Sequence, residues 1–264
     1  MNSHLDDAVK AAETAGKILS ERFNNPKVKT KNIKDVVTDA DLESENAIKK
    51  FLMEKYPDYG FLGEETGFKK GNKTWVVDPI DGTRAFSFGI PNFSVSIALV
   101  ENGKSMVGVV YNPMTGETFT SEKGGGAFFN GKLIGKSAKE KPTEECLVGC
   151  TFQYHRKELL KLEENVNVCL VNFSPALDVC RVAQGRIDAA VHGLTEIFDH
   201  AAASLIAVES GLKITNFGKK SWDIVDLGIL AASPAIHGRL EALFPEPLRN
   251  LDKGEKFYTK KYEL

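Results

Sequence analysis

The chain has 264 residues, a length that corresponds to one large domain or two closely packed ones. Its 42% hydrophobic and 27% charged residues are typical of a globular protein with a sizeable core. A formal net charge of −2 lacks the basic excess of proteins that bind nucleic acids or membrane surfaces. No apolar run is long enough to cross a bilayer, and the N-terminal residues lack the basic head and apolar stretch of a signal peptide. We therefore expect a soluble, cytoplasmic protein with no nucleic-acid or membrane partner.

The cysteines all lie in the second half of the chain. Cys146 and Cys150 have C-x₃-C spacing, without a second pair or a histidine at the spacing of a zinc finger. Cys169 and Cys180 lie in apolar or helical contexts typical of buried free thiols. The sequence thus predicts reduced cysteines and no disulfide, as in a reducing compartment.

Helical spacing of apolar residues predicts a first helix over 5–23, which ends before Pro26. The lysine-rich segment 27–35 fits either a loop or a short hairpin. A second helix is expected from Thr38, where T-D-A-D resembles a capping box with Asp in place of Glu, until Pro57.

Strand-like patterns dominate the remainder of the first half. Alternating or continuous apolar runs predict strands at 74–78, 93–100, 105–111, 117–120 and 127–129. Asn-Gly pairs at 102–103 and 130–131 mark hairpin turns. The N-terminal half, 1–145, is therefore predicted as two helices followed by a largely antiparallel sheet.

From residue 146 onward, apolar strands and helical segments alternate. The strands are predicted at 146–151, 166–171, 186–191, 212–215 and 225–232, and the helices at 155–164, 175–184, 199–210 and 235–243. Such alternation is typical of an α/β layer with several βα crossovers. We expect this C-terminal half, 146–264, to share one interface with the first half and its charged tail, 250–264, to be mobile or lightly packed.

The hexapeptide D-P-I-D-G-T at 78–83 holds two carboxylates three positions apart at the end of an apolar run. Pro79 stiffens the turn, and Gly82 permits an unusual backbone angle or the close approach of a ligand. A helix that opens at Thr83 would offer free N–H groups to an anion. The motif fits either a cation site beside a phosphate site, or an ordinary Asp-Pro turn in which Asp81 forms an Asx turn.

Further acidic residues bear on this choice. Glu64 and Glu65 occupy a loop between two apolar runs, Asp41 lies in the first turn of the second helix, and Asp199 begins an apolar helix. The helix dipole alone suits both aspartates to these positions. Crowded carboxylates repel one another unless cations lie between them, so a shared cation site is the other explanation.

Taken in order, these segments resemble the inositol monophosphatase family. The resemblance is carried by D-x-x-x-E after V-V-T, G-E-E at 63–65, W-V-V-D-P-I-D-G-T at 75–83 and F-D-H-A-A-A…E-S-G at 198–211, and it extends over 5–243. This family belongs to the lithium-sensitive, magnesium-dependent sugar phosphatases, together with the fructose-1,6-bisphosphatases. The resemblance implies an α+β fold, a layered αβαβα sandwich of two sheets with helices between and outside them. It also implies a site between the two halves and a homodimer.

The same resemblance implies a role for each acidic residue. Glu64 and Asp78 would bind a first Mg²⁺ together with the backbone carbonyl of Ile80. Asp78, Asp81 and Asp199 would bind a second Mg²⁺, and a third, weaker ion would lie near Glu64. Magnesium prefers hard oxygen ligands and keeps several waters, so this set of donors is sufficient.

The resemblance also implies how the reaction proceeds. Asp41 and Thr83, with Glu64 as a further catalytic candidate, would orient and deprotonate a metal-activated water that attacks phosphorus in line. The amides of Gly82 and Thr83 would hold the phosphate, and Asp81 and Asp199 would also border the substrate. The expected reaction is Mg²⁺-dependent hydrolysis of a small phosphorylated polyol or sugar, inositol phosphates and fructose 1,6-bisphosphate included, and lithium should inhibit it.

One segment departs from the family pattern. The usual Trp-Asp pair is Phe-Asp at 198–199, and the glutamate that contacts a sugar hydroxyl falls on Val191 or His192. His192 is either a substrate contact or a strand-end histidine satisfied by backbone or water, and Thr151 is a further candidate contact. We therefore expect no strong preference for myo-inositol 1-phosphate.

Related activities remain as alternatives. These are the hydrolysis of histidinol phosphate or of 3′-phosphoadenosine 5′-phosphate, although the run at 93–103 resembles the inositol and fructose branch more closely. A role of another class is contact with proteins of transcription or ribosome assembly, as in some bacterial relatives. The complete set of acidic residues favours an enzyme over a protein retained for binding alone.

Overall fold

The structure is a computed structural model that describes residues 3–24, 26, 28–32, 35–137, 139–151, 156–193, 195–218 and 221–246. The predicted charged tail, 250–264, lies outside these residues, as do parts of the lysine-rich segment. Within the described residues, no helix combines the length and the apolar character that crossing a membrane requires.

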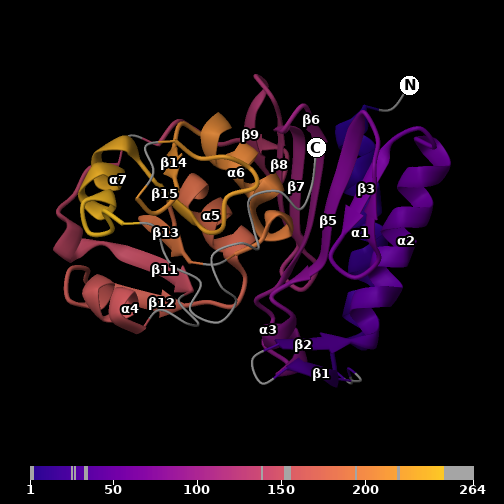
Figure 1. The fold of residues 1–264 in the computed structure, drawn as a ribbon, viewed down its shortest axis with the longest axis horizontal. Coiled ribbons are helices and arrows are strands. Elements are labelled where there is room, and N and C mark those ends of the chain that lie inside the picture. The colour runs from indigo at the N-terminus through magenta and orange to yellow at the C-terminus, as the bar shows by residue number, and fades with distance from the viewer. Residues whose placement is uncertain are drawn as a thin grey trace.

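Helices and sheets alternate as five layers, which confirms the predicted αβαβα sandwich (Figure 1). The first layer holds helices α1 (His4–Arg22) and α2 (Asp39–Lys55), and it covers one face of an eight-stranded sheet. Helices α5 (Pro175–Gln184) and α6 (Ile197–Glu209) lie between this sheet and a five-stranded sheet. Helices α4 (Arg156–Glu163) and α7 (Pro234–Glu241) cover the outer face of the second sheet.

The larger sheet has the order β10-β9-β8-β7-β6-β5-β3-β4, and only the β3–β5 pair is parallel. Its strands are β3 (Gly60–Gly63), β4 (Gly67–Lys69), β5 (Lys73–Asp81), β6 (Ser94–Glu101), β7 (Lys104–Asn112), β8 (Glu117–Glu122), β9 (Gly126–Phe129) and β10 (Lys132–Leu133). Both predicted Asn-Gly turns are present, with positive φ at each residue, as a two-residue hairpin turn of this kind requires. The sequence patterns did not identify β3 and β4, which are short strands that begin with glycine.

The lysine-rich segment is the hairpin rather than the loop. Strand β1 (Val28–Asn32) pairs antiparallel with β2 (Asp35–Thr38), and β2 leads directly into α2. The backbone N–H of Thr38 donates to the carboxylate of Asp41 at 2.7 Å, which is one half of the predicted capping box.

The smaller sheet has the order β12-β11-β13-β15-β14. Its strands are β11 (Leu147–Thr151), β12 (Val168–Val171), β13 (Ala189–His192), β14 (Lys213–Thr215) and β15 (Ile229–Ala232). The first three strands in this order are parallel, but β15 runs antiparallel to β13 and β14. The predicted βα crossovers are therefore present from β11 to β14, because β13 and β14 are both antiparallel to β15 and so run in the same direction, and only β15 departs from the pattern. The division of the chain at residue 145 stays a prediction.

The alternation of side chains along β5 separates two of the cores. Trp75 and Val77 pack with α1 and α2, whereas Val76 points to the opposite face and packs with α5 and α6. A third cluster fills the space between the smaller sheet and its outer helices. The middle helices lie close to the larger sheet, because an ideal Cβ on Gly108 of β7 would lie 2.7 Å from the carbonyl oxygen of Ala202 in α6.

Candidate active site

Acidic side chains from several segments converge at the carboxyl end of β5. Oxygen atoms of Asp78, Asp81 and Asp199 lie within 4.8 Å of one another. Glu64, in the turn after β3, and Asp41, in the first turn of α2, lie near enough for their charges to raise the pKa of Asp78. The structure thus brings together all the acidic residues to which the sequence assigned a site.

A bulge explains how the two aspartates of β5 reach the same place. Residues three positions apart on a regular strand point to opposite faces. Here Asp78 pairs with Ser96 and Asp81 with Ser94, so β5 has one residue more than β6 over this stretch. The extra residue returns Asp81 to the side of Asp78. The N–H of Ile80 donates to Oδ1 of Asp78 at 2.9 Å and fixes the bend.

Asp81 has one saturated and one unpartnered carboxylate oxygen. Its Oδ2 accepts hydrogen bonds from the hydroxyls of Ser94 (3.2 Å) and Ser174 and from the N–H of Ala176 (3.0 Å). Its Oδ1 is buried without a hydrogen-bond partner among the described residues. A buried, unpartnered carboxylate oxygen is costly unless a cation meets it. This orphaned atom is therefore evidence for a cation site.

The electrostatics of the cluster agree with that interpretation. Burial raises the pKa of Asp78 well above its usual range, and the charges of Glu64, Asp81 and Asp199 raise it further. Burial and the charge of Asp81 also raise the pKa of Asp199. Burial raises the pKa of Asp81 to about 7, although its hydrogen bonds oppose the shift. Hard oxygen donors that repel one another without a cation fit Mg²⁺.

Asp41 and Thr83 form a hydrogen-bonded pair beside the cluster. The hydroxyl of Thr83 lies 3.1 Å from Oδ1 of Asp41 and 3.0 Å from the carbonyl oxygen of Ile80. Oδ2 of Asp41 accepts hydrogen bonds from the backbone N–H and the hydroxyl of Thr38. Burial raises the pKa of Asp41 to about 6 despite these bonds, because the side chain is almost fully enclosed.

Gly82 lies at the N-cap of the short helix α3 (Thr83–Ser87), with φ of 102°. An ideal Cβ at this position would lie 3.1 Å from the carbonyl oxygens of Asn92 and Phe173. Both the positive φ and the close carbonyl groups therefore favour glycine. The first N–H groups of a helix lack intrahelical partners and suit an anion. This is where the sequence predicts the phosphate.

The Glu64 turn is held by a buried residue of the D-x-x-x-E motif, to which the sequence assigned no role. The carboxylate of Glu45, from α2, accepts hydrogen bonds from the N–H groups of Glu65 (2.8 Å) and Thr66 (2.6 Å). Gly63 leaves room for it, because an ideal Cβ there would overlap the Glu45 carboxylate. Glu45 therefore positions the turn that carries Glu64.

Three serines that support the site were also missed. Ser94 and Ser174 donate to Asp81, and Ser96 donates to the carbonyl oxygen of Phe198 at 3.0 Å, next to Asp199. Ser94 and Ser96 lie two positions apart in an otherwise apolar strand and are fully buried or nearly so. Polar residues on one face of a buried strand were the available signal.

The candidate substrate contacts, buried His192 and half-buried Thr151, are hydrogen-bonded to each other. Nδ1 of His192 lies 3.1 Å from the Thr151 hydroxyl, and Nε2 lies 3.4 Å from Oδ2 of Asp178. The ring is fully buried, and burial lowers the pKa of His192 to about 3. Among the described residues, the hydrogen-bond partner of the ring is thus the Thr151 side chain rather than a backbone group. A direct substrate contact by either residue stays a prediction.

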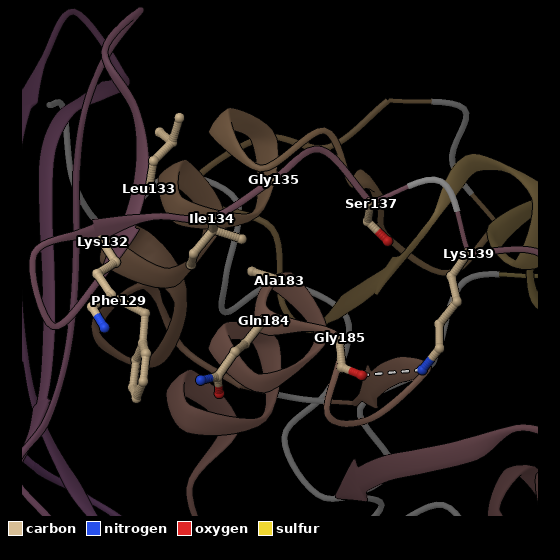
Figure 2. Close-up of a pocket in the computed structure, with 10 residues that line it drawn as sticks. All are labelled: Phe129, Lys132, Leu133, Ile134, Gly135, Ser137, Lys139, Ala183, Gln184 and Gly185. Atoms are coloured by element: carbon tan, nitrogen blue, oxygen red, sulfur yellow. Dashed lines mark hydrogen bonds between the residues drawn. The ribbon is translucent and has the colours of Figure 1, made fainter.

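A cavity of about 520 Å³ lies elsewhere in the molecule (Figure 2). It opens between Phe129, the segment 132–139 and the C-terminal end of α5, where Lys139 donates to the carbonyl of Gly185 at 3.1 Å. The partners of Asp81 lie at the N-terminal end of α5, and a helix of ten residues spans about 15 Å. The cavity is therefore separate from the acidic cluster.

Comparisons with known proteins agree with this geometry. The family model described as the inositol monophosphatase family matches residues 1–249. A Thermotoga maritima protein named fructose-1,6-bisphosphatase/inositol-1-monophosphatase is 33% identical over 252 residues, which cover 94% of this chain and 98% of the relative. A Pasteurella multocida protein named Nus factor SuhB is 33% identical and covers 89% and 93% of the two chains. The solved structure of an IMPase from Thermotoga maritima matches with a TM-score of 0.85 at 33% identity, covering 91% of this chain and 96% of that one.

Proposed function

The chain belongs to the inositol monophosphatase family, and from this premise we propose that it hydrolyses small phosphate monoesters of polyols or sugars in a Mg²⁺-dependent reaction. The observation that carries the proposal is the orphaned Oδ1 of Asp81, which lies beside oxygens of Asp78 and Asp199 and next to the Asp41–Thr83 pair. These groups supply what phosphoryl transfer to water requires, namely cation ligands and a polar pair that can orient a nucleophile.

The proposed ligands divide into two sets. Glu64, Asp78 and the carbonyl oxygen of Ile80 would hold one Mg²⁺, and Asp78, Asp81 and Asp199 would hold another. A third ion near Glu64 belongs to the same proposal. When bound, Mg²⁺ supplies positive charge that polarises the phosphate and lowers the pKa of a nearby water.

The Asp41–Thr83 pair would position the attacking water. When the single proton of the Thr83 hydroxyl points to Asp41, the lone pairs of Oγ1 are free to take a proton from water while the Thr83 proton passes to the Asp41 carboxylate. This arrangement also releases the carbonyl oxygen of Ile80 for a cation. Because the pKa of Asp41 is raised to about 6, its carboxylate is ionised at neutral pH yet more basic than an exposed aspartate.

The phosphate group of the substrate would bind at the backbone N–H groups of Gly82 and Thr83. We propose that the enzyme accepts several monoesters, inositol phosphates and fructose 1,6-bisphosphate among them, in agreement with the name of the Thermotoga maritima relative. This chain has Val191 or His192 at the position where the family has a glutamate that contacts a sugar hydroxyl. A neutral, buried histidine does not replace the charge of a glutamate.

A substrate panel tests the proposal. Phosphate release is measured at saturating Mg²⁺ with inositol 1-phosphate, fructose 1,6-bisphosphate, histidinol phosphate and 3′-phosphoadenosine 5′-phosphate. We expect the first two to be hydrolysed at comparable rates and Asp81→Asn to lower kcat by at least about 100-fold. Undiminished activity in Asp81→Asn would rule out the two-metal assignment. A steep preference for inositol 1-phosphate would contradict the proposal that several monoesters are accepted.

Lithium provides an independent test of the cation site. We expect Li⁺ to inhibit phosphate release by displacing one Mg²⁺, and added Mg²⁺ to weaken the inhibition. The measurement is the rate as a function of LiCl at two Mg²⁺ concentrations, with KCl at equal ionic strength as the control. Full activity at high LiCl would count against a lithium-sensitive Mg²⁺ site like that of the inositol monophosphatase family.

Two proposals concern partners. We propose a homodimer on the basis of the family resemblance, and light scattering on the full-length protein tests it. A second role in protein contacts is suggested by the relative named Nus factor SuhB. If the chain had only that role, the substrate panel would yield no Mg²⁺-dependent phosphate release.

A further inference from the structure

Two cysteines on neighbouring strands are in direct contact. Cys150 lies in β11 and Cys169 in β12, and their Sγ atoms are 3.0 Å apart. The strands are parallel, and Cys169 pairs in register with Val148 while Cys150 pairs with Val171. The two thiols therefore lean towards each other diagonally across one pair of strands. All four cysteines of the chain are reduced in the structure.

The separation of the two sulfur atoms is already close to that in a disulfide. The sulfur atoms of a disulfide are about 2.05 Å apart, so the gap must shorten by about 1 Å. Both strands are anchored in the same sheet, and Cys150 and Cys169 contact the same apolar cluster. The other two cysteines are placed differently: Cys146 contacts the carbonyl of Pro142 at 3.4 Å, and Cys180 is buried in α5.

We propose that Cys150 and Cys169 are a modification site, at which a low-molecular-weight disulfide such as oxidised glutathione converts the two thiols reversibly into an intramolecular disulfide. The site lies in the second sheet, on residues outside the proposed ligand set, and does not depend on the phosphatase activity.

The surroundings assign a different step to each thiol. Cys169 is partly exposed, whereas Cys150 is buried, so a dissolved oxidant meets Cys169 first. The hydrogen bond between the two thiols lowers the pKa of Cys169 and, together with burial, raises that of Cys150. Since the thiolate is the nucleophile, Cys169 attacks and Cys150 resolves.

The exchange balances in two steps. The Cys169 thiolate attacks one sulfur of oxidised glutathione, which breaks the S–S bond, forms a mixed disulfide and expels one glutathione thiolate. The Cys150 sulfur then attacks Cys169, its proton passes to the second glutathione thiolate, and that thiol leaves. Two cysteine thiols are thereby oxidised to one disulfide, and one glutathione disulfide is reduced to two glutathione thiols.

The disulfide would lie near a segment that supports the acidic site. Thr151, next to Cys150, donates a hydrogen bond to the carbonyl of Asn172 at 3.2 Å, just beyond the end of β12. Two residues further on, Ser174 donates to Asp81. Oxidation therefore ties β11 to β12, the strand from which this segment leads to the site.

Mass spectrometry on the full-length chain tests the proposal. The reduced protein is equilibrated in glutathione buffers of increasing oxidised fraction, quenched with acid, and alkylated with N-ethylmaleimide in denaturant. We expect the wild type to lose two of its four alkylatable thiols together, as a monomer, and the mapped peptides to join Cys150 to Cys169. Dithiothreitol should restore all four.

Matched variants separate this pair from general oxidation. Cys146→Ser should form the same disulfide, whereas Cys150→Ser should carry one glutathione on Cys169 and no internal bond. In 8 M urea, the wild type should lose its selectivity for this pair, because the fold brings the thiols together. Four alkylatable thiols at every buffer ratio, glutathione adducts without an internal bond, or cross-links to other cysteines or other chains would each overturn the proposal. Because mapping on the wild type decides the question, an unfolded variant would not obscure it.

Discussion

At the scale of single residues, Asp178 is a buried carboxyl outside the proposed ligand set. Its Oδ1 accepts a hydrogen bond from Asn172 at 2.7 Å, and its Oδ2 faces the neutral ring of His192 at 3.4 Å. Gly149 makes room for it, because an ideal Cβ there would lie 2.6 Å from Oδ2. Burial raises the pKa of Asp178 to about 7, although Asn172 and the charge of Arg181 oppose the shift.

This raised pKa makes the free energy of unfolding depend on pH. The folded chain keeps the Asp178 proton until about pH 7, whereas the unfolded chain loses it near the usual value of 3.8. Because the folded state binds more protons between these values, the free energy of unfolding falls as pH rises from about 4 to 7. A difference of about 3 between the pKa of Asp178 in the folded and the unfolded chain changes the free energy of unfolding by at most about 4 kcal/mol.

We predict that Asp178→Asn removes this part of the pH dependence. The asparagine keeps an acceptor for Asn172 but has no proton to release, so the variant gains stability relative to wild type between pH 5 and 8. Urea unfolding at fixed Mg²⁺ measures the difference.

Asp188→Asn is the matched control for Asp178→Asn. Lys139 and Lys141 pair with Asp188, and the pKa of this carboxyl is lowered below its usual value of 3.8, so the control should be less stable than wild type above about pH 4 by an amount that does not change with pH from 5 to 8. Parallel pH profiles for wild type and Asp178→Asn would show that Asp178 is not the titrating group.

At the scale of elements, α6 joins the site to the larger sheet. Gly108 of β7 allows this helix to approach so closely that an added Cβ would lie 2.7 Å from the carbonyl oxygen of Ala202. The same helix carries Asp199 in its first turn. Any displacement of α6 from the sheet should therefore also move Asp199 relative to Asp78 and Asp81.

We predict that Gly108→Ala destabilises the protein by about 1–3 kcal/mol, the usual cost of overpacking a close backbone contact. It should also reduce the rise in thermal midpoint that Mg²⁺ produces, because Asp199 is displaced. Gly238→Ala in α7 is the control, since its Cβ would meet no atom within 4 Å and alanine favours an exposed helix by about 0.5–1 kcal/mol. If Gly108→Ala is destabilised but keeps the full Mg²⁺-induced rise in thermal midpoint, the packing of α6 against β7 does not control the position of Asp199.

The elements also show where prediction from sequence stops. The Asn-Gly turns and the long helices follow from local patterns, because their signals lie in a few adjacent residues. The bulge between Asp78 and Asp81 does not, because it depends on pairing with Ser94 and Ser96. The antiparallel placement of β15 is likewise decided by partners remote in the chain.

The contrast between local sequence signals and contacts with remote residues also applies to the candidate active site. The motifs, read through the family resemblance, name Asp41, Glu64, Thr83 and the other acidic residues. Of the partners that hold them, Glu45 ends the D-x-x-x-E motif but receives no role from it, and Ser174 lies in no motif. Their roles follow only from buried contacts with residues 20 or more positions away.

At the scale of the whole molecule, the acidic cluster joins two of the five layers. Asp78 and Asp81 belong to the larger sheet, and Asp199 belongs to the middle helices. In the metal-free protein the carboxyls repel one another across this boundary. A bound divalent cation would replace that repulsion with attraction.

We predict that the metal-free protein loses stability as pH rises from about 5 to 8. Burial and crowding raise the pKa values of Asp78, Asp81 and Asp199 above those of the unfolded chain, so the folded state binds more protons in this range. Mg²⁺ competes with those protons and should stabilise more strongly at pH 8 than at pH 5. At 100 times its dissociation constant, one ion contributes about 2.7 kcal/mol.

Thermal unfolding in EDTA and in saturating MgCl₂, at several pH values, measures both effects. The Mg²⁺-induced rise in midpoint should be several degrees at pH 8 and small at pH 5. In Asp81→Asn the fall in EDTA should be shallower, because one of the carboxyls no longer ionises, and the Mg²⁺ response should shrink at every pH. A Mg²⁺ response that is independent of pH and retained in Asp81→Asn would mean that the cation binds elsewhere, because protons and cation would then not compete for these oxygens.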